Sequence, residues 1–394
     1  MKKIVNFLFV VILLYAQPYT ILVSFDGFRW DYLKRNITPN IDKMIENGVH
    51  AVSLKPVYPS ITFPNHISII SGVYPQNHNI ISNFFKDIKN NKEYKITDTF
   101  EVRNPYWYNC EPFWETAEKN GIKTSAYFWP FSDNSIPFKR PSIYKKYDHF
   151  FPYTQRVDSI LSWITLPYNQ RPKFFTLYFD ATDTYGHKFG TDSKEIDSII
   201  VVLDNLVGSL INGLKKTNLL DSTNIVLVSD HGMYNIKGVI NLYEHLKTFK
   251  YEKVTSGTIF SIEAKKQKDV YKKLKENENN YKVYLKKDIP NYLNIKKAKF
   301  LGNILVVPEP GYIVTDNPKT EYEAKLKASH GWDNNFIHMH GIFVATGPSF
   351  KKNYKIGTLS NIDIYPLLCK IYNINYNHKI DGKIENIDFI LKEE

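Results

Sequence analysis

Cysteine is scarce in this chain of 394 residues, which contains only Cys110 and Cys369. The two cysteines are far apart, and neither has a neighbour at the spacing of a thiolate metal site, so a zinc site built from cysteine pairs is excluded. An exported protein could join them by a disulfide, and the sequence leaves that pairing open. A metal site in this chain must therefore use histidine and carboxylate side chains.

Long apolar runs are also missing after the first residues. Residues 1–16 have a basic head at Lys2 and Lys3, an apolar run from Ile4 to Leu14 and a small residue at Ala16, which is the pattern of a secretory signal peptide. No later segment reaches the roughly 20 consecutive apolar residues of a membrane-spanning helix. We therefore expect an exported protein, periplasmic or secreted, with no transmembrane segment in the mature chain.

The sequence has no internal repeat and no low-complexity tract, which excludes a solenoid and argues against a disordered region. Basic residues outnumber acidic ones, 51 to 40, and removal of residues 1–16 would take two lysines and lower the formal charge from +11 to +9. The lysines scattered over residues 265–275 are typical of a solvated helix face. We expect no binding of duplex nucleic acid, although the positive charge favours the approach of anionic substrates.

Strand-like apolar runs alternate with helix-like amphipathic stretches, which predicts an α/β fold: a three-layer α/β/α sandwich with helices on both faces of a sheet. Thr38 and Pro39 should begin a helix that ends at Gly48, and Ser193 could cap a long helix running to about Lys216. The predicted buried strands are residues 20–25, 49–55, 124–128, 174–179, 224–229 and 342–346.

The length allows one large domain or two ordinary ones, and we expect one domain over residues 17–394. Between about residues 235 and 316 the periodicity weakens while lysine and asparagine become more frequent. We interpret residues 235–316 as a smaller cap subdomain inserted into that domain.

Aspartate and histidine residues follow several predicted strands directly, at the sheet edge where α/β proteins place their sites. Each alone would more often be a turn or cap residue, but four such clusters would each need a separate structural reason. Together they offer six ligands, enough for two zinc ions with three protein ligands each. The six are Asp26, Asp183, His187, Asp230, His231 and His330.

Asp183 and His187 are four residues apart in this set. A helical segment would place both side chains on one face, as metal ligands require. Gly186, between them, favours a turn instead, so the local structure stays open at this point.

Thr62 is the candidate nucleophile. It lies just before Pro64, where a helix should begin, and the free N–H groups and positive end of that helix would stabilise a nearby phosphoryl oxygen. A threonine hydroxyl is a poor nucleophile at neutral pH, but coordination to zinc can convert it to an alkoxide. The alternative is that Thr62 only caps the helix.

With these residues identified, the chain resembles the nucleotide pyrophosphatase/phosphodiesterase family of the alkaline phosphatase superfamily over nearly all of residues 17–394. The matching stretches are Ser24 to Arg29, Thr62 to His66, Gly72 to Pro75, Asp183 to His187, Ser229 to Met233 and His330 to Asn334. The resemblance implies an alkaline phosphatase-like fold in the compact form of bacterial relatives, without the cysteine-rich and nuclease-like domains of larger animal members.

The resemblance also implies roles for individual residues. One zinc would be held by Asp183, His187 and His330, and the other by Asp26, Asp230, His231 and the Thr62 oxygen. Asn83 falls where relatives place an asparagine that donates to a phosphoryl oxygen. Phe63 and Tyr147 fall where nucleotide-cleaving relatives stack the base between two aromatic rings, although both could be ordinary core aromatics. Phe131 replaces a glycine of many relatives, which could narrow or reshape the base pocket.

The expected function is zinc-dependent hydrolysis of phosphodiester and pyrophosphate bonds in nucleotides and their derivatives. The products would be nucleoside 5'-monophosphates, formed through a nucleotidyl-threonine. One alternative is a phosphodiesterase of the same family that acts on choline-bearing or glycerol-bearing phospholipid diesters, against which Phe63 and Tyr147 count. The other is a non-catalytic exported binding protein, against which the full ligand set counts. The sequence gives no indication of the oligomeric state.

Overall fold

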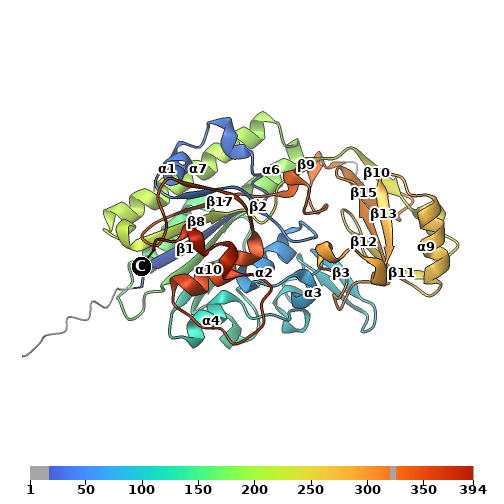
Figure 1. The fold of residues 1–394 in the computed structure, drawn as a ribbon, viewed down its shortest axis with the longest axis horizontal. Coiled ribbons are helices and arrows are strands. Elements are labelled where there is room, and N and C mark those ends of the chain that lie inside the picture. The colour runs from blue at the N-terminus through green and yellow to red at the C-terminus, as the bar shows by residue number, and fades with distance from the viewer. Residues whose placement is uncertain (1–16, 320–324, 394) are drawn as a thin grey trace, which may run out of the picture.

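The computed structural model describes residues 17–319 and 325–393, and the predicted signal peptide, residues 1–16, lies outside them. The centre of the described part is an eight-stranded sheet. In spatial order its strands are β18 (Tyr354–Ser360), β2 (Val49–Lys55), β17 (Phe343–Thr346), β8 (Thr223–Val228), β1 (Tyr19–Phe25), β7 (Phe174–Phe179), β5 (Thr124–Tyr127) and β6 (Ile143–Lys145). Helices cover both faces of this sheet (Figure 1), which confirms the predicted three-layer sandwich.

Neighbouring strands of the main sheet are parallel except where β17 runs antiparallel between β2 and β8. All residues of β1, β7 and β8 are buried. Since both faces of these strands are covered, their sequences are mostly apolar rather than alternating. The strands predicted at 49–55 and 174–179 have the observed bounds, and the other four differ by one residue at one or both ends.

The helices pack in two layers. The α-helices of the described residues are α1 (Pro39–Glu46), α2 (Thr62–Ser71), α3 (Pro75–His78), α4 (Phe113–Lys119), α5 (Tyr153–Ile164), α6 (Ala181–Phe189), α7 (Lys194–Lys216), α8 (Tyr243–Leu246), α9 (Gln267–Glu276) and α10 (Ile364–Ile371). On one face of the main sheet, α1, α5 and α7 share an apolar cluster with the strands. On the other face, α2, α4 and α10 belong to a second cluster.

The starts of α1 and α7 are capped in different ways. Ser193 caps α7 as predicted, because its hydroxyl accepts a hydrogen bond of 3.2 Å from the main-chain N–H three residues later. Thr38 makes no side-chain cap bond within the described residues. The N–H groups of Asn40 and Ile41 instead donate to the buried Asp204 carboxylate of α7, at 3.0 and 2.8 Å. Asp204 thus joins the two helices and satisfies N–H groups that the first turn leaves free.

Helix α7 is the one helix of the described residues whose length and composition would suit a membrane span. Half of its most apolar stretch is buried within the protein. Its buried side packs with α1 and α5 against the main sheet. This is the packing of a core helix, whose apolar face is buried by protein.

A second sheet lies apart from the main one, at the right in Figure 1. It is antiparallel, in the order β11 (Tyr251–Thr255), β12 (Phe260–Ala264), β14 (Ile304–Pro308) and β13 (Tyr281–Leu285). It shares its own apolar cluster with α8 and α9. Beside it, β10 (Gly238–Asn241) pairs in parallel with β15 (Tyr312–Thr315). We propose that residues 235–316, which contain all of these elements, are the inserted subdomain.

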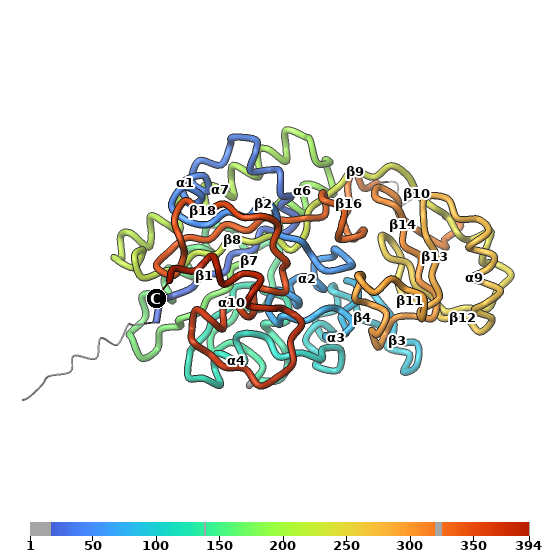
Figure 2. The backbone as a smooth tube through the Cα atoms, viewed as in Figure 1, coloured from blue at the N-terminus to red at the C-terminus, as the bar shows by residue number. Residues whose placement is uncertain are grey.

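The inserted part contacts the main body through a hairpin. The hairpin consists of β3 (Phe84–Asp87) and β4 (Lys92–Lys95), and β3 lies beside β11 (Figure 2). A further short pair, β9 (Tyr234–Asn235) and β16 (Ala328–Ser329), brings together the two chain segments that enter and leave this part. The lysines of residues 265–275, on and just before α9, are exposed to solvent.

The two cysteines are free thiols in the described structure, and this answers the question that the sequence left open. Cys369 lies on α10 in the main apolar cluster, and Cys110 is half-buried against the same cluster. Burial raises the pKa of both thiols to about 12. Both therefore remain protonated at neutral pH and act as small apolar side chains.

His78, at the end of α3, is fully buried in a polar network. Its Nδ1 accepts a hydrogen bond of 3.1 Å from the N–H of Ile80, so the ring proton is on Nε2. Nε2 then donates to the Ser68 hydroxyl at 3.0 Å, and that hydroxyl donates to the Val73 carbonyl at 2.8 Å. Burial lowers the pKa of His78 to about 3. The neutral ring thus closes the turn between α2 and the following loop.

This network predicts that His78 makes the fold sensitive to acid. The unfolded chain takes up a proton on His78 below pH ~6.5, whereas the folded protein does so only near pH 3, so stability is full above pH ~6.5 and is lost as the pH falls. Protonation of His78 in the unfolded chain should lower the free energy of unfolding by about 2 kcal/mol between pH 7 and pH 5. Urea unfolding at both pH values should show that His78→Gln loses less stability than the unaltered protein by about this amount. Equal losses in the two proteins would contradict the assignment.

Candidate active site

The predicted site residues gather at one edge of the main sheet, where the adjacent parallel strands β8, β1 and β7 end. Asp26 directly follows β1, Asp230 and His231 come just after β8, and Asp183 lies in the first turn of α6, which begins two residues after β7. His330 directly follows β16. Neighbouring parallel strands have their carboxyl ends at the same edge, which is why residues so distant in sequence meet here.

Asp183, His187 and His330 form the first cluster. Asp183 and His187 lie one turn apart on α6, so the turn that Gly186 suggested is wrong. A Cβ on Gly186 would lie 3.0 Å from Cε of Met233, so packing between helix and loop explains this glycine. The Nε2 atoms of His187 and His330 each lie 3.3 Å from Oδ1 of Asp183.

Asp26, Asp230 and His231 form the second cluster. His231 Nε2 lies 3.3 Å from Asp26 Oδ1 and 3.1 Å from Asp230 Oδ2. The second Asp26 oxygen accepts a hydrogen bond of 2.6 Å from the Tyr178 hydroxyl. The rings of His231 and His330 stack with centroids 3.6 Å apart, which places the two clusters side by side.

The three imidazoles of the clusters are oriented in the same way. In each ring Nδ1 lies within hydrogen-bond distance of a main-chain carbonyl oxygen, and a carbonyl can only accept, so Nδ1 carries the proton. The pairs are His187 with Ala328 at 2.9 Å, His231 with Gly232 at 2.8 Å and His330 with Ser60 at 2.9 Å. In the neutral ring this leaves the Nε2 lone pair facing the carboxylates, the arrangement of metal-ligating histidines.

The carboxylates of the clusters also fit a metal. Among the described residues, Asp26 Oδ1, Asp183 Oδ1 and Asp230 Oδ2 are buried oxygens without a hydrogen-bond donor. A buried carboxylate oxygen that faces an imidazole lone pair is unfavourable unless a cation or proton lies between them. Oxygen and nitrogen donors without thiolate suit zinc. Two groups have donor atoms within 4.8 Å of one another: Asp183 with His231 and His330, and Asp26 with His66 and Asp230. These residues are therefore candidate metal ligands.

The pKa values of the two clusters reflect this crowding. Burial raises the pKa of Asp26 well above its usual range, and the nearby Asp230 and Asp183 carboxylates raise it further. Burial alone would lower the pKa of His187, but the Asp183 carboxylate outweighs burial and raises it to about 8. Burial lowers the pKa of His330 to about 3. Protons at Asp26 and His187 compete with a divalent cation for the same lone pairs, so metal binding would release them.

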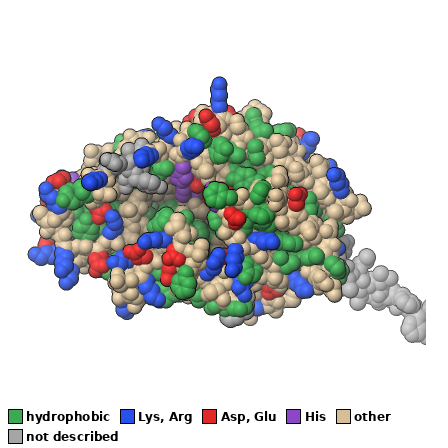
Figure 3. Space-filling model, turned by 180° about the vertical axis from the view of Figure 1, so that it is seen from behind, with side chains coloured by type: hydrophobic (Ala, Val, Ile, Leu, Met, Phe, Trp, Pro, Cys, Tyr) green, Lys and Arg blue, Asp and Glu red, His purple; other side chains and the backbone are tan. Residues whose placement is uncertain are grey.

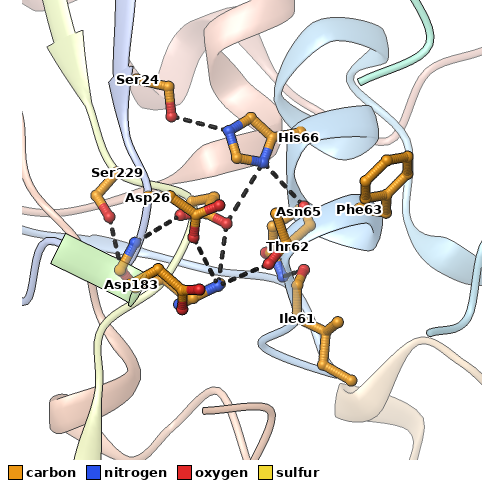
Figure 4. Close-up of polar contacts among 12 residues, drawn as sticks. Ser24, Asp26, Ile61, Thr62, Phe63, Asn65, His66, Asp183 and Ser229 are labelled. Atoms are coloured by element: carbon orange, nitrogen blue, oxygen red, sulfur yellow. Dashed lines mark hydrogen bonds and ion pairs between the residues drawn. The ribbon is translucent and has the colours of Figure 1, made fainter. Parts of the chain in front are cut away.

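Thr62 points toward the second cluster from the start of α2 (Figure 4). Its hydroxyl lies 3.3 Å from His231 Nε2 and is buried. The helix begins at Thr62, its N-cap is Ile61, and neither side chain caps it within the described residues. The interpretation of Thr62 as a mere cap is therefore wrong. Its hydroxyl does not cap the helix and instead lies beside His231, at the positive end of α2.

Asn83 and Phe63 are linked beside Thr62. The Phe63 N–H donates to Asn83 Oδ1 at 3.0 Å. This bond uses the amide oxygen of Asn83, so the NH2 group is the part of its side chain left to donate to a ligand. The Phe63 ring points away from the carboxylates (Figure 4) and contacts Tyr94 edge to face.

The two clusters open into a cavity of about 350 Å³. A hollow with histidine at its base is visible on the face shown in Figure 3. The cavity is lined by Thr62, Asp26 and the first cluster, and also by aromatic side chains that include Phe63, Phe128 and Tyr147. Tyr147 is half exposed and contacts Phe128 edge to face. Both predicted stacking residues thus line the same cavity as the candidate nucleophile.

Phe131, the expected departure from the family pattern, also lines this cavity. Its φ is 77°, the left-handed region that glycine favours and bulky residues avoid. The ring is buried and stacks on Tyr108, with centroids 4.1 Å apart. The backbone therefore keeps the conformation of a glycine position, and the added ring becomes part of the cavity wall.

His66 is a site residue that the sequence analysis did not assign. Its position beside Asp26 and Asp230 would allow a metal ligand. However, its Nδ1 lies 2.9 Å from the Thr62 carbonyl oxygen and 3.4 Å from Asp230 Oδ2, and its Nε2 is bonded to the Ser24 hydroxyl at 2.8 Å. Both ring nitrogens are therefore used, and His66 supports Thr62 and Asp230 from behind (Figure 4). The sequence feature that could have indicated His66 is its position four residues after Thr62.

Comparisons with known proteins identify relatives of this chain. Residues 20–333 match the family model described as type I phosphodiesterase / nucleotide pyrophosphatase. Human ectonucleotide pyrophosphatase/phosphodiesterase family member 1 is 36% identical over 377 residues, which cover 91% of this chain and 40% of that protein. The bis(5'-adenosyl)-triphosphatase of Xenopus laevis is 33% identical over 383 residues, which cover 96% of this chain and 83% of that protein.

Solved structures of proteins with related names have the same fold as this chain. Human ectonucleotide pyrophosphatase/phosphodiesterase 5 superimposes with a TM-score of 0.88 at 31% identity, covering 95% of this chain and 100% of that one. The murine protein matches equally well as an inactive threonine-to-alanine variant in complex with AMP. The chain spans about two fifths of the length of the human family member 1. The family match, the relatives and the fold lead to one conclusion: this chain belongs to the type I phosphodiesterase/nucleotide pyrophosphatase family.

Proposed function

We propose that this protein hydrolyses phosphodiester and pyrophosphate bonds in nucleotides and their derivatives and releases nucleoside 5'-monophosphates. The observation that carries the proposal is the Thr62 hydroxyl, which lies at a helix start beside two clusters of candidate metal ligands and lines an aromatic-walled cavity. The name of the Xenopus relative and the AMP complex of the murine relative support nucleotides as substrates. The ectonucleotidase names of relatives support an exported protein.

Two zinc ions per chain are the proposed cofactor. The first cluster, Asp183, His187 and His330, would hold one, and the second cluster, Asp26, Asp230 and His231, would hold the other together with the Thr62 oxygen. Unpartnered carboxylate oxygens and Nε2 lone pairs that face them support this assignment. Bound zinc would supply Lewis acidity, lowering the pKa of a coordinated hydroxyl and offsetting charge on phosphoryl oxygens.

The protein residues would divide the reaction into two displacements. Thr62 Oγ loses its proton to solvent and attacks phosphorus, and the bond to the leaving group breaks as the nucleotidyl-threonine forms. Water then attacks the same phosphorus, the threonine oxygen regains a proton, and the 5'-monophosphate leaves. The Asn83 NH2 group, held by its bond to the Phe63 N–H, would donate to a phosphoryl oxygen in both steps. Phe63 and Tyr147 would hold the base by stacking.

The first prediction concerns the nucleophile. Thr62→Ala should lower the rate of hydrolysis of the nitrophenyl ester of thymidine monophosphate by about a thousandfold or more, because no covalent intermediate can form. Thr62→Ser keeps a hydroxyl and should retain measurable activity. Acid quenching of the Thr62→Ser or unaltered protein should trap a nucleotidyl adduct, seen by mass spectrometry. An unchanged rate in Thr62→Ala would show that the nucleophile is misassigned.

The second prediction concerns the metals. Purified protein should contain close to two zinc ions per chain by elemental analysis, and Asp183→Asn should contain about one, because it disrupts only the first cluster. Zinc restored after chelation should raise the melting temperature, since the cations offset the repulsion between buried carboxylates. Asp42→Asn, on α1 far from the clusters, is the matched control. Folded protein that takes up no transition metal would end the proposal.

The third prediction concerns the base. Phe63→Ala and Tyr147→Ala should each lower kcat/KM for the nitrophenyl ester of thymidine monophosphate by about tenfold, through a rise in KM, because each removes one stacking surface. Hydrolysis of methyl nitrophenyl phosphate, which has no base, should change much less. Equal losses on the two substrates would mean that these rings only support the fold of the site.

A further inference from the structure

Three polar side chains beside the cavity have no role in the function proposed above. They are Arg156 on α5, Asp180 at the start of α6 and His149 in the loop before α5. Arg156 and Asp180 are buried, whereas the His149 side chain is 49% exposed. Asp180 and His149 both line the cavity. In a cavity lined largely by aromatic side chains, a few placed polar groups fix the orientation of a ligand, so this group is a candidate binding element.

Arg156 holds this group in place. Its guanidinium is fully buried and donates to the main-chain carbonyls of Tyr178 at 2.9 Å and Phe151 at 3.1 Å. The same guanidinium reaches the Asp180 carboxylate at 3.4 Å and the His149 carbonyl oxygen at 3.5 Å. One side chain therefore positions both the backbone of His149 and the carboxylate that faces its ring.

Asp180 orients the His149 ring. His149 Nδ1 lies 3.2 Å from Asp180 Oδ2 and 3.3 Å from the Tyr147 hydroxyl. A proton on Nδ1 that is shared with Asp180 fixes the ring plane and leaves Nε2 at the opposite edge. A ring that carries protons on both nitrogens donates from Nδ1 to Asp180 and from Nε2 to an anionic oxygen, so a bound anion and Asp180 would hold His149 from its two edges.

The position of Asp180 shows which part of a substrate would meet this ring. Asp180 lies three residues before Asp183 of the first cluster and caps the same helix, since the Thr184 N–H donates to its carbonyl oxygen at 3.1 Å. Thr184, His187 and His149 line the same cavity. In the proposed mechanism Thr62 attacks beside the second cluster, so the leaving group departs beside the first cluster, toward α6 and His149.

We propose that His149 binds the phosphate oxygens of the leaving group and so favours phosphoanhydride substrates over simple esters. The inference rests on the proposed function and specifies its substrate class. The leaving group of a nucleoside triphosphate or dinucleotide polyphosphate carries such oxygens, whereas that of a nitrophenyl ester carries none. His149 is thus a specificity-determining residue for this site.

A purely structural role for His149 would be to hold the Tyr147 hydroxyl. The surroundings of Asp180 argue against this as the main role of His149. Asp180 is already paired with the buried Arg156, so it needs no second cation for its own charge. Only Nδ1 of His149 contacts Tyr147 and Asp180, so a purely structural role would not involve the exposed part of the ring.

Binding measurements in the zinc-loaded Thr62→Ala protein test the inference without turnover. By titration calorimetry, adding His149→Ala should weaken the binding of ATP about tenfold, because a hydrogen bond to a charged oxygen is lost, and that of AMP less than about twofold. His149→Gln keeps a donor and should recover part of the ATP affinity. With Thr62 present, the ratio of kcat/KM for ATP to that for the nitrophenyl ester should fall about tenfold in His149→Ala.

Two matched variants separate the possible causes. Tyr147→Phe removes the hydroxyl contact but keeps the ring, and it should leave the ratio of ATP to AMP affinity unchanged. His245→Ala, on α8 outside the cavity, should alter neither affinity. Equal weakening of ATP and AMP in His149→Ala, or no weakening, overturns the role of His149 while the proposed function stands. If the unaltered zinc-loaded protein hydrolyses neither ATP nor the ester, the proposed function itself is wrong.

Discussion

The structure depends on one electrostatic arrangement: three carboxylates, each with a buried oxygen, pack against three imidazoles at the end of three parallel strands. Asp26, Asp183 and Asp230 each leave an oxygen without a donor among the described residues. Carbonyl oxygens hold the Nδ1 edges of the imidazoles, so their Nε2 lone pairs face the same carboxylates. Carboxylate oxygens that face imidazole lone pairs are unfavourable in free energy when they are buried without a cation. The requirement for positive charge at this edge of the sheet is therefore built into the fold, before any substrate enters.

The parallel sheet makes this arrangement possible. β1 pairs with β7 on one side and β8 on the other, in register and fully buried. Residues just beyond the three strands must therefore lie within a few ångströms of one another, although Asp26 and Asp230 are 204 positions apart in the sequence. Rigid, buried strands also hold the donors in one geometry, which a two-metal site requires. The candidate nucleophile, Thr62, comes from a fourth element, the first turn of α2.

The sequence predicted which aspartate and histidine side chains meet at this edge of the sheet, because their positions depend on residue type and on strand ends, which are local features. It predicted less well the local structure that depends on tertiary contacts. Gly186 suggested a turn, yet it lies within α6, where a Cβ would be 3.0 Å from the Met233 side chain. Thr38 should have capped α1, but Asp204 does so from another helix. The link between Arg156, Asp180 and His149 joins ordinary residues that only the fold brings together. The sequence indicated an inserted subdomain over residues 235–316 but did not predict the strands of its sheet.

Phe131 shows that the wall of the cavity can differ without a change in the candidate metal ligands. A bulky residue at a φ of 77° costs of order 1–3 kcal/mol, and stacking on Tyr108 offsets part of that strain. The backbone path is kept, so the change thickens the aromatic wall without displacing the ligands at the strand ends. Phe131, Tyr147 and His149 all come from the segment between β5 and α5, most of it loop. Loops tolerate change better than buried strands. The aromatic wall of the cavity can therefore change while the candidate metal ligands at the strand ends remain in place.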